Sequence, residues 1–145
     1  KQFGGESLEL AEGLCVGGRI RLASSDVAGA LAAAERALAV MERLDVTATS
    51  EETACRSLRA EALLGLSRNI DARAEVERAL QRVRLTNPGA HVKLARLLML
   101  RARSERGIGD DRAAATTLEE ARALRVDPEL LAAEDRAALG LSARP

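Results

Sequence analysis

The sequence predicts an all-α fold in which pairs of helices repeat along one domain. Residues 29–38 recur in altered form at 71–80, and more faintly around 114–121. Polar or glycine-containing breaks separate the apolar helical segments. A fixed period of about 20–50 residues is typical of stacked repeats, in which one unit cannot bury its own apolar face. Shifting the sequence against itself by 42 residues aligns three columns of small residues: Gly18, Ala60 and Ala102; Ala30, Ala72 and Ala114; Ala37, Ala79 and Ala121.

Caps and polar breaks give the boundaries of the expected helices. The segment 24–26, Ser-Ser-Asp, ends the first helix and offers a cap to the second. Thr49 and Glu52 have the spacing of a capping box, in which hydroxyl and carboxylate each satisfy a free backbone amide. Asp127 and Pro128 supply a cap and a first-turn proline to the last helix. The expected helices cover residues 7–23, 26–44, 50–66, 70–85, 90–106, 111–124 and 128–139.

These helices group into three pairs and a final single helix. The pairs are expected at about residues 7–45, 49–86 and 88–125. The segment 128–139 carries the charged run Glu-Asp-Arg, which suits a helix that covers the last apolar face of a stack and faces water itself. The sequence therefore predicts that residues 1–145 form one helical repeat domain with a C-terminal capping helix.

Composition excludes two classes of partner and favours a cytoplasmic setting. The formal net charge is zero and Phe3 is the only aromatic residue, so neither the basic field nor the stacking platforms of a nucleic-acid-binding domain are present. No apolar run is long enough to span a bilayer, and no signal-like segment opens the sequence. Arginine and alanine dominate, as is typical of GC-rich bacterial coding. Because the first residue is not methionine, we expect a fragment of a larger protein.

The reactive residue types suggest neither a catalytic centre nor a site for a cofactor or metal. Cys15 and Cys55 are far apart in the sequence and form no CxxC motif, so we expect small helix residues that are buried or half-buried. His91, the only histidine, is expected in the first turn of a helix, exposed to solvent. Neighbouring Glu and Arg residues have the helical spacings of surface ion pairs. Phosphate-binding loops and nucleophile elbows are not found.

The small-residue columns resemble those of the tetratricopeptide repeat family. Its helix-turn-helix unit keeps a small residue late in the first helix, another early in the second helix and a third two turns later, here Gly18, Ala30 and Ala37. The longer period of 42 is similar to that of kinesin light chains and of bacterial regulators of the LuxR-type, maltose-regulator-like group. Segment 100–103 followed by 109–110 is similar to the second group. The resemblance implies a right-handed α-solenoid that binds proteins within a bacterial multidomain regulator.

The sequence departs from this family at large positions in the first helix of each pair. The second-helix columns do not depend on these positions, so the departures leave only the rotation of the first helices open. The two large aromatic-type positions fall on Leu14, Arg56 and Leu98 and on Arg21, Leu63 and Glu105, and Arg59 and Arg101 stand where leucine is usual.

By the resemblance, the first helices line a concave groove that takes a peptide or helix from a partner protein. Its apolar members would bury apolar anchors, and Arg96, Arg103 and Arg106 would bind an acidic group. The alternative is that these arginines form an ordinary solvated face. The positions carried over are Glu12, Cys15, Val16, Arg19, Leu22, Ala54, Ser57, Leu58, Glu61, Leu64, Arg96, Met99, Leu100, Arg103 and Arg106.

One segment leaves other functions open. Residues 94–100 are apolar around more than one face of their helix, which is unusual for an exposed groove helix. Either this run is buried between its own pair and the seventh helix, or it is a surface for self-association. The alternatives to peptide binding are therefore a self-associating scaffold, such as a homodimer, and more remotely a small-molecule sensor.

Overall fold

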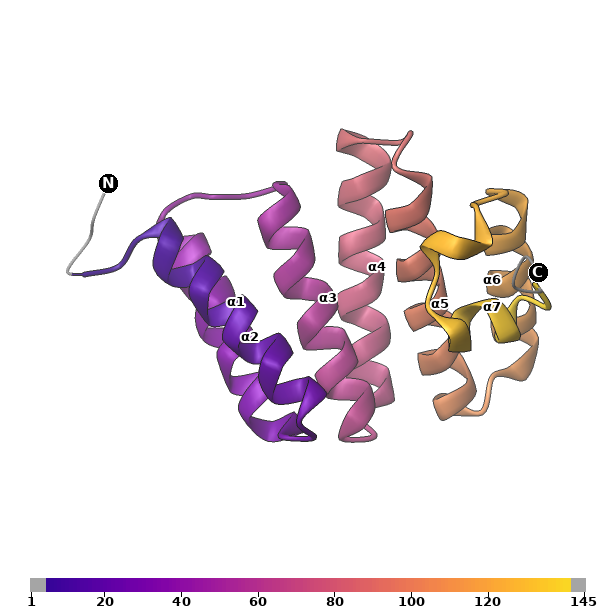
Figure 1. Cartoon of the computed structure of the whole chain (residues 1–145), viewed down its shortest axis with the longest axis horizontal. Helices are drawn as coiled ribbons and strands as arrows, with labels where there is room; N and C mark the ends of the chain where they lie inside the picture. The colour runs from indigo at the N-terminus through magenta and orange to yellow at the C-terminus, as the bar shows by residue number, and fades with distance from the viewer. Residues whose placement is uncertain (1–4, 142–145) are drawn as a thin grey trace.

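A computed structural model describes residues 5–141 and confirms the predicted all-α class. Six long helices follow one another across the molecule, and a short C-terminal segment folds beside the last of them (Figure 1). Within the described residues, none of the helices has the length and apolar character needed to cross a membrane. The elements are α1 (Leu8–Ala23), α2 (Val27–Arg43), α3 (Ser50–Gly65), α4 (Asn69–Thr86), α5 (His91–Ile108), α6 (Asp111–Ala123), the 3-10 turn η1 (Pro128–Leu130) and α7 (Ala133–Ala138).

The backbone conformation repeats along the chain at the same 42-residue period as the sequence. Ser25, Ser67 and Gly109 end α1, α3 and α5, and all three take a positive φ, at 67°, 58° and 91°. The amide after each of them donates to a carbonyl five residues earlier, which is the longer bond of a Schellman motif. These bonds are Asp26 to Arg21 (2.8 Å), Arg68 to Leu63 (2.9 Å) and Asp110 to Glu105 (2.9 Å).

The three columns of small residues are buried where helices approach closely. All nine positions are classed as buried, and Ala30, Ala37 and Ala72 are fully shielded from water. A Cβ atom placed on Gly18 would lie 2.7 Å from Leu58 Cδ2 and 3.2 Å from Ala33 Cβ. Glycine at position 18 therefore lets α1 approach both α2 and α3.

Side-chain caps begin four of the long helices. Ser7 accepts from the amide of Leu10, and Asp26 and Asp110 accept from the amides three residues further on, at 3.0–3.1 Å. The Thr49 hydroxyl accepts from the Glu52 amide at 3.1 Å, as a capping box requires. The Glu52 carboxylate bonds one residue earlier than expected, because it accepts from the amide of Ala48 at 2.6 Å.

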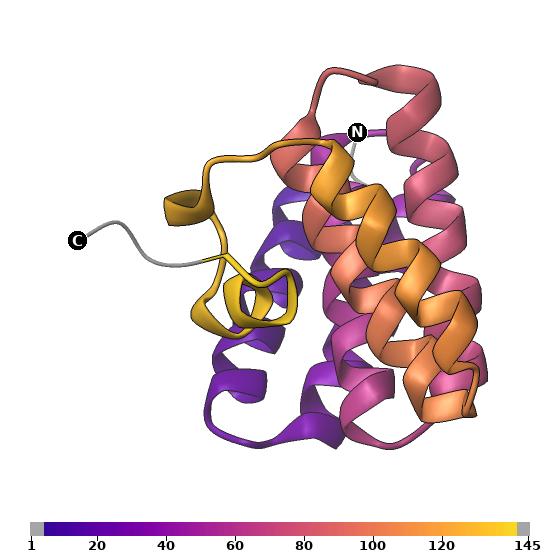
Figure 2. The ribbon, with the colours of Figure 1, turned by 90° about the vertical axis from the view of Figure 1, so that its right-hand side faces the viewer.

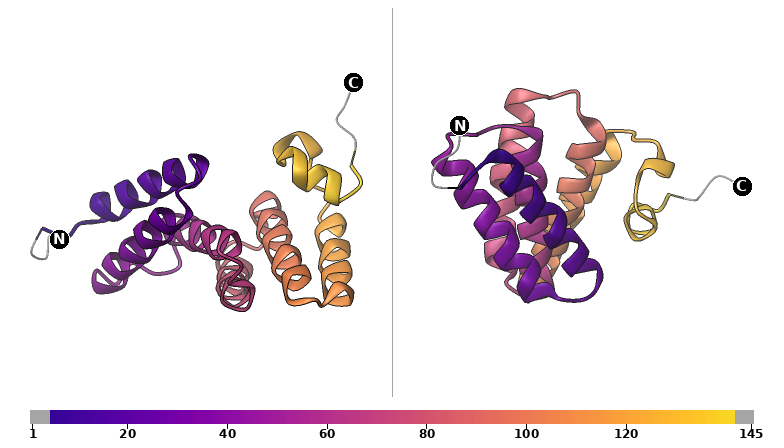
Figure 3. Two further views of the ribbon diagram at one scale, coloured as in Figure 1. Left: turned by 90° about the horizontal axis from the view of Figure 1, so that it is seen from below. Right: turned by 60° about the vertical axis from the view of Figure 1, so that its left-hand side comes forward.

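Helices that are adjacent in sequence pack side by side, and the apolar interior falls into two clusters. Besides contacting the helix that follows it, α1 also contacts α3, and α3 contacts α5 (Figure 3). The first cluster joins α1, α2 and α3, with Met41 and Leu58 among its largest buried side chains. The second joins α4, α5 and α6 with Leu131 and Leu139 of the C-terminal segment. The segment 94–100 lies in this second cluster, so its apolar faces are covered within the chain.

The prediction of one continuous capping helix over residues 128–139 is wrong. The chain instead forms η1, passes through extended residues at Leu131 and Ala132, and then forms α7. Two observations accompany the break. Leu131 and Leu139 are both buried at the second cluster, and the Arg136 guanidinium donates to the carbonyls of Pro128 and Leu131. Figure 2 shows this segment crossing from the end of α6 to one side of the helices.

Candidate functional site

An open trough of about 1080 Å³ lies between α1, α3, α5 and the C-terminal segment. In the view from below in Figure 3, α3 and α5 lie between α1 on one side and the C-terminal segment with α7 on the other. The trough is lined by Arg19, Ser50, Thr53, Ala54, Ser57, Glu61, Gly89, Ala90, His91, Val92, Lys93, Arg96, Leu97, Leu100, Arg103, Glu129, Leu130, Leu131, Ala132, Glu134 and Asp135.

The floor of the trough is made of small and apolar side chains from α3 and α5. Ala54 and Ser57 face it from α3, and Leu97 and Leu100 from α5. The two leucines are 1% and 4% exposed, so they present only an edge to the trough while their bulk supports the second cluster. This floor offers limited apolar contact and no deep pocket for a single large side chain.

Arg19 and Glu61 join α1 to α3 at one side of the trough. Arg19 donates to the backbone carbonyl of Ala54 at 3.1 Å, and its Nη1 lies 3.7 Å from Glu61 Oε1. Both side chains are substantially exposed, and exposed pairs contribute at most about 1 kcal/mol. These two groups can therefore turn toward a bound molecule at little cost.

The C-terminal segment supplies partners for the arginines on the opposite side. Arg96 donates to the Leu130 carbonyl at 2.9 Å. Arg103 lies 3.4 Å from Glu134 Oε1 and 3.7 Å from Asp135 Oδ1. Burial raises the pKa of the Asp135 carboxyl, although Arg103 acts against this. The acidic group expected from a partner at Arg103 is thus provided by the chain itself.

Two cations of the trough form no ion pair within 4 Å among residues 5–141, although the charge of Arg96 still acts on the Asp135 carboxyl. Lys93 Nζ lies 3.2 Å from Ser50 Oγ, which joins the starts of α5 and α3, and Arg96 bonds only the Leu130 carbonyl. His91 lines the same end of the trough and is exposed, as expected. This end of the trough is the part best suited to an anionic group.

The structure divides the ten residues singled out for partner binding. Leu58 and Met99 are buried beneath the surface, at 0% and 2% exposure, so neither can anchor a partner in this conformation. Val16 lies on α1, is 60% exposed and does not line the trough. Leu64 and Arg106 line a neighbouring pocket of about 590 Å³. The trough itself brings together Arg19, Glu61, Arg96, Leu100 and Arg103.

The remaining carried-over positions divide in the same way. Ala54 and Ser57 line the trough, whereas Leu22 lines the neighbouring pocket. Glu12 is exposed on α1, and Cys15 is buried. Sequence reasoning missed Lys93 and every contribution of the C-terminal segment. The repeat pattern gave no indication of Lys93, because the equivalent position in the second pair is occupied by Glu51, which has the opposite charge.

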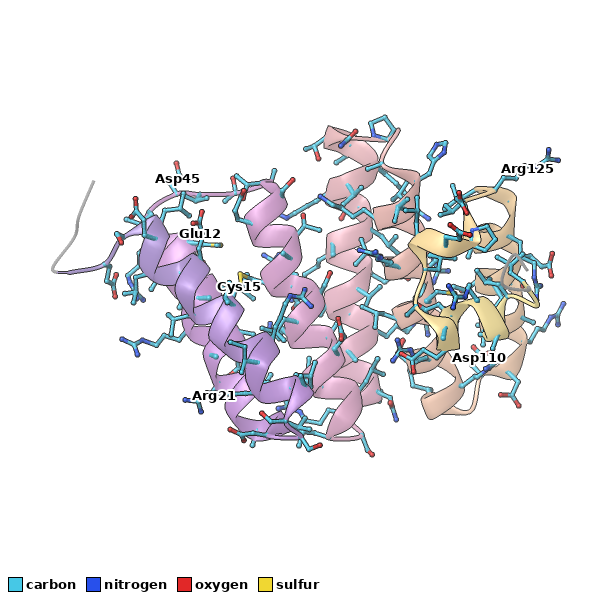
Figure 4. All side chains as sticks on the ribbon, in the orientation of Figure 1. Glu12, Cys15, Arg21, Asp45, Asp110 and Arg125 are labelled. Carbon is cyan, nitrogen blue, oxygen red and sulfur yellow. A yellow bond between two sulfur atoms is a disulfide. The ribbon has the colours of Figure 1, made fainter. Side chains whose placement is uncertain are left out.

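Cys15 and Cys55 form a disulfide that joins α1 to α3. Their Cα atoms are 5.6 Å apart, within the range for such bonds, and Figure 4 shows the sulfur atoms between the two helices. The expectation that both are buried holds, at 8% and 1% exposure. The pairing was not expected, because it depends on the rotation of the first helices, which the sequence leaves open.

The glutamates of several Glu–Arg neighbours that have surface spacings are instead buried between helices, whereas their arginines remain partly exposed. Glu75 is 2% exposed and accepts from Arg56 at 2.7 Å and Arg59 at 2.8 Å. Burial alone would lower the pKa of Arg56, but hydrogen bonds to Glu75 and Glu52 raise it. The expectation of surface pairs is wrong here. Arg56 and Arg59 stand at two of the positions that depart from the tetratricopeptide pattern, and this departure was the available signal.

A second buried carboxylate lies in the third pair. Glu105 is fully buried, accepts from Arg101 Nε at 2.9 Å and accepts from the Thr117 hydroxyl at 2.7 Å. Burial would lower the pKa of Arg101, whereas the Glu105 hydrogen bond and the charges of nearby glutamates raise it. Arg101 and Glu105 both belong to α5, and the Thr117 hydroxyl bond links this pair to α6. Among the described residues, no three His, Cys, Asp or Glu side chains are placed to hold a metal ion.

Comparison with known proteins finds no matching family model, no matching curated protein and no matching solved structure.

Proposed function

We propose that this chain is a protein-interaction module built as a right-handed α-solenoid of three tetratricopeptide-like helical pairs. Two observations support the architecture. The turns at Ser25, Ser67 and Gly109 have the same left-handed geometry and recur at the period of the sequence. The first helices of successive pairs also contact one another, α1 with α3 and α3 with α5. Stacking of this kind produces an extended concave surface that suits an elongated partner.

The partner we propose is a peptide segment with an acidic residue. The observation that carries this proposal is the open trough of about 1080 Å³ with Lys93 and Arg96 at one end and no carboxylate bound to either among the described residues. A carboxylate placed there would form charge-assisted hydrogen bonds with both cations. The rest of the segment would lie over Ser57 and Leu100. Small-molecule sensing is less favoured, because such ligands are usually enclosed.

The setting we propose follows from the family resemblance and not from the trough. In bacterial multidomain regulators of the LuxR-type, maltose-regulator-like group, a helical stack receives a signal and a neighbouring domain gives the response. On this proposal, the trough receives an acidic segment of another protein.

A peptide-display selection tests the proposed partner chemistry. Wild type and Lys93→Glu/Arg96→Glu are each used to select binders from the same random peptide library. We expect the wild type to select acidic peptides. The double variant should bind these same peptides about 100-fold or more weakly, which is the scale of two charge-assisted contacts. Arg112→Glu, on the exposed start of α6, is the matched control. Enrichment of peptides that bind the double variant equally well would contradict the proposal.

A further inference from the structure

The outer face of α1 carries Glu9 in its first turn and is apolar beyond it, and no described residue covers it. Val16 and Ile20, one turn apart, are 60% and 66% exposed. Cβ atoms built on Gly13 and Gly17 would meet nothing within 4 Å. The opposite face of the same helix is buried through residues such as Cys15. The helix is therefore apolar on two sides, although only one of them packs within the chain.

The period shows that this outer face corresponds to surfaces that are covered elsewhere. Val16 occupies the same column of the repeat as Leu58 and Leu100, which are 0% and 4% exposed. Leu58 packs beside Gly18 of α1, so the preceding pair covers this face of α3. The equivalent face of α1 lacks such a neighbour among residues 5–141. This face therefore corresponds to a helix-packing surface, but no helix among residues 5–141 packs against it.

The opposite end of the molecule is closed. Leu131 and Leu139 are buried at the second cluster, and α7 presents Glu134, whose side chain is 71% exposed, to solvent. An end-to-end contact would need two complementary apolar ends, whereas among residues 5–141 only the α1 end leaves such a helix face uncovered. Association through α1 is therefore expected to be isologous, with the same face used by both copies, which gives a closed dimer and not a filament.

Charge along the edge of this face favours an antiparallel pairing. Glu12 and Arg19 are seven residues apart, two turns, so they share one edge of α1. When two such helices pack antiparallel, equivalent edges meet, and Glu12 of each copy lies beside Arg19 of the other. In that register Val16 of each copy packs between Gly13 and Gly17 of the other, where no side chain obstructs it. A parallel pairing would set this edge against the opposite edge of the second helix and would lose both ion pairs.

We propose that a second copy of this chain covers the outer face of α1 through this antiparallel, two-fold symmetric contact. The helix has 16 residues, about 24 Å, so the interface is at the small end of specific interfaces and the dimer is expected to be weak. Arg19 borders the trough and pairs with Glu61 at 3.7 Å, but the remaining contact residues lie outside the trough. This inference does not depend on the proposed peptide binding.

Sedimentation velocity over a wide range of protein concentration tests the proposal. We expect a reversible monomer–dimer equilibrium for the wild type. Val16→Glu/Ile20→Glu should raise the dimer dissociation constant by about 100-fold or more, because it buries two unpaired charges from each copy. Leu85→Glu, at a residue 78% exposed on α4, is the matched control and should leave the equilibrium unchanged. Unchanged helical circular dichroism confirms that each variant is folded.

A charge exchange tests the antiparallel register separately. Glu12→Arg and Arg19→Glu should each weaken self-association, because like charges then face one another twice. An equimolar mixture of these two variants should associate at least as tightly as the wild type, since both contacts are restored between unlike copies. A monomeric wild type at all concentrations would overturn the proposal and leave a helix from another polypeptide segment as the occupant of this face. A mixture that associates no better than its components would overturn the antiparallel contact.

Discussion

The first helical pair and the two pairs that follow share a backbone period but differ in what joins their helices. In the first pair, small side chains allow close approach, with Gly18 against Ala33, and a disulfide from Cys15 holds α1 to α3. In the second pair, the buried carboxylate of Glu75 accepts from arginines of the neighbouring helix, and in the third pair the buried carboxylate of Glu105 accepts from the Thr117 hydroxyl across the contact. Apolar packing thus joins the helices in both regions, and the second region adds buried carboxylates whose oxygens have partners.

One column of the repeat makes this difference explicit. Ala33, Glu75 and Thr117 occupy equivalent positions of the period and stand on the second helix of their pairs. Glu75 is bound by two arginines, and the Thr117 hydroxyl donates to Glu105. A buried carboxylate is tolerated only when its oxygens are paired, since an unpaired one costs several kcal/mol. The period therefore specifies helix spacing, and local partners decide which chemistry is allowed at each position.

Glu105→Ala should produce the largest change. We expect a loss of about 3–5 kcal/mol in the free energy of unfolding, because Arg101 and the Thr117 hydroxyl lose their shared partner inside the molecule. Glu77→Ala is the matched control: Glu77 lies 3.1 Å from the same Arg101, but its side chain is 43% exposed, so the cost should stay below about 1 kcal/mol. Denaturant unfolding measures both. Equal costs would mean that burial does not distinguish these two pairs.

Reduction of the disulfide should have the next largest effect and should act on the first region alone. Opening a link that spans a sequence separation of 40 is expected to lower the free energy of unfolding by about 2–4 kcal/mol. Thermal unfolding with and without a phosphine reductant measures it. Cys15→Ser/Cys55→Ser is the control and should not respond to the reductant. An identical midpoint for oxidised and reduced wild type would show that packing alone holds α1 to α3.

Two neighbouring glycines of α1 should respond in opposite directions to the same substitution. Gly18→Ala should destabilise the fold by about 1–3 kcal/mol, because the new methyl would lie 2.7 Å from Leu58 Cδ2. Gly17→Ala should stabilise it by about 0.5–1 kcal/mol, since its Cβ meets nothing within 4 Å and alanine favours a helix. Denaturant midpoints at low protein concentration compare them. Equal effects would remove the argument for close approach at position 18.

The smallest expected effect is a pH dependence at the C-terminal segment. Burial raises the pKa of Asp135 in the folded protein, so the folded state holds this proton more tightly than the unfolded state. Its contribution to stability is complete below the unfolded pKa of about 3.9 and is lost as pH rises through the folded value. The difference in unfolding free energy between wild type and Asp135→Asn should therefore fall with rising pH. A difference that rises with pH would contradict this account.

Much of the fold could be predicted because its signals are local. Caps such as Asp26 and Thr49 and the polar breaks placed most helix ends within a few residues, and the alanine columns identified the buried contacts. The path of residues 128–141 could not be predicted, because it depends on where Leu131 and Leu139 pack and on hydrogen bonds from the Arg136 side chain to carbonyls of the same segment. Neither requirement is visible as a pattern in that segment.

The candidate site was predicted in part for a related reason. Arg19, Glu61 and Arg103 line the trough because they occupy the expected side of the first helices. Leu58 and Met99 are buried instead, because the rotation of each helix about its axis determines whether a side chain faces the trough or the interior. The sequence did not determine that rotation, since arginines stand at positions where the repeat family usually has leucine. The same open rotation concealed the disulfide and the burial of the glutamates.

Distance measurement between spin labels tests the repeat architecture most directly. Positions 32, 74 and 116 are exposed, lie on α2, α4 and α6, and are equivalent in the period. With the disulfide intact, pulsed dipolar spectroscopy on labelled double-cysteine variants should give similar distances for 32–74 and 74–116 and a clearly longer one for 32–116. A 32–116 distance no longer than the other two would indicate a closed bundle and contradict the stacked arrangement.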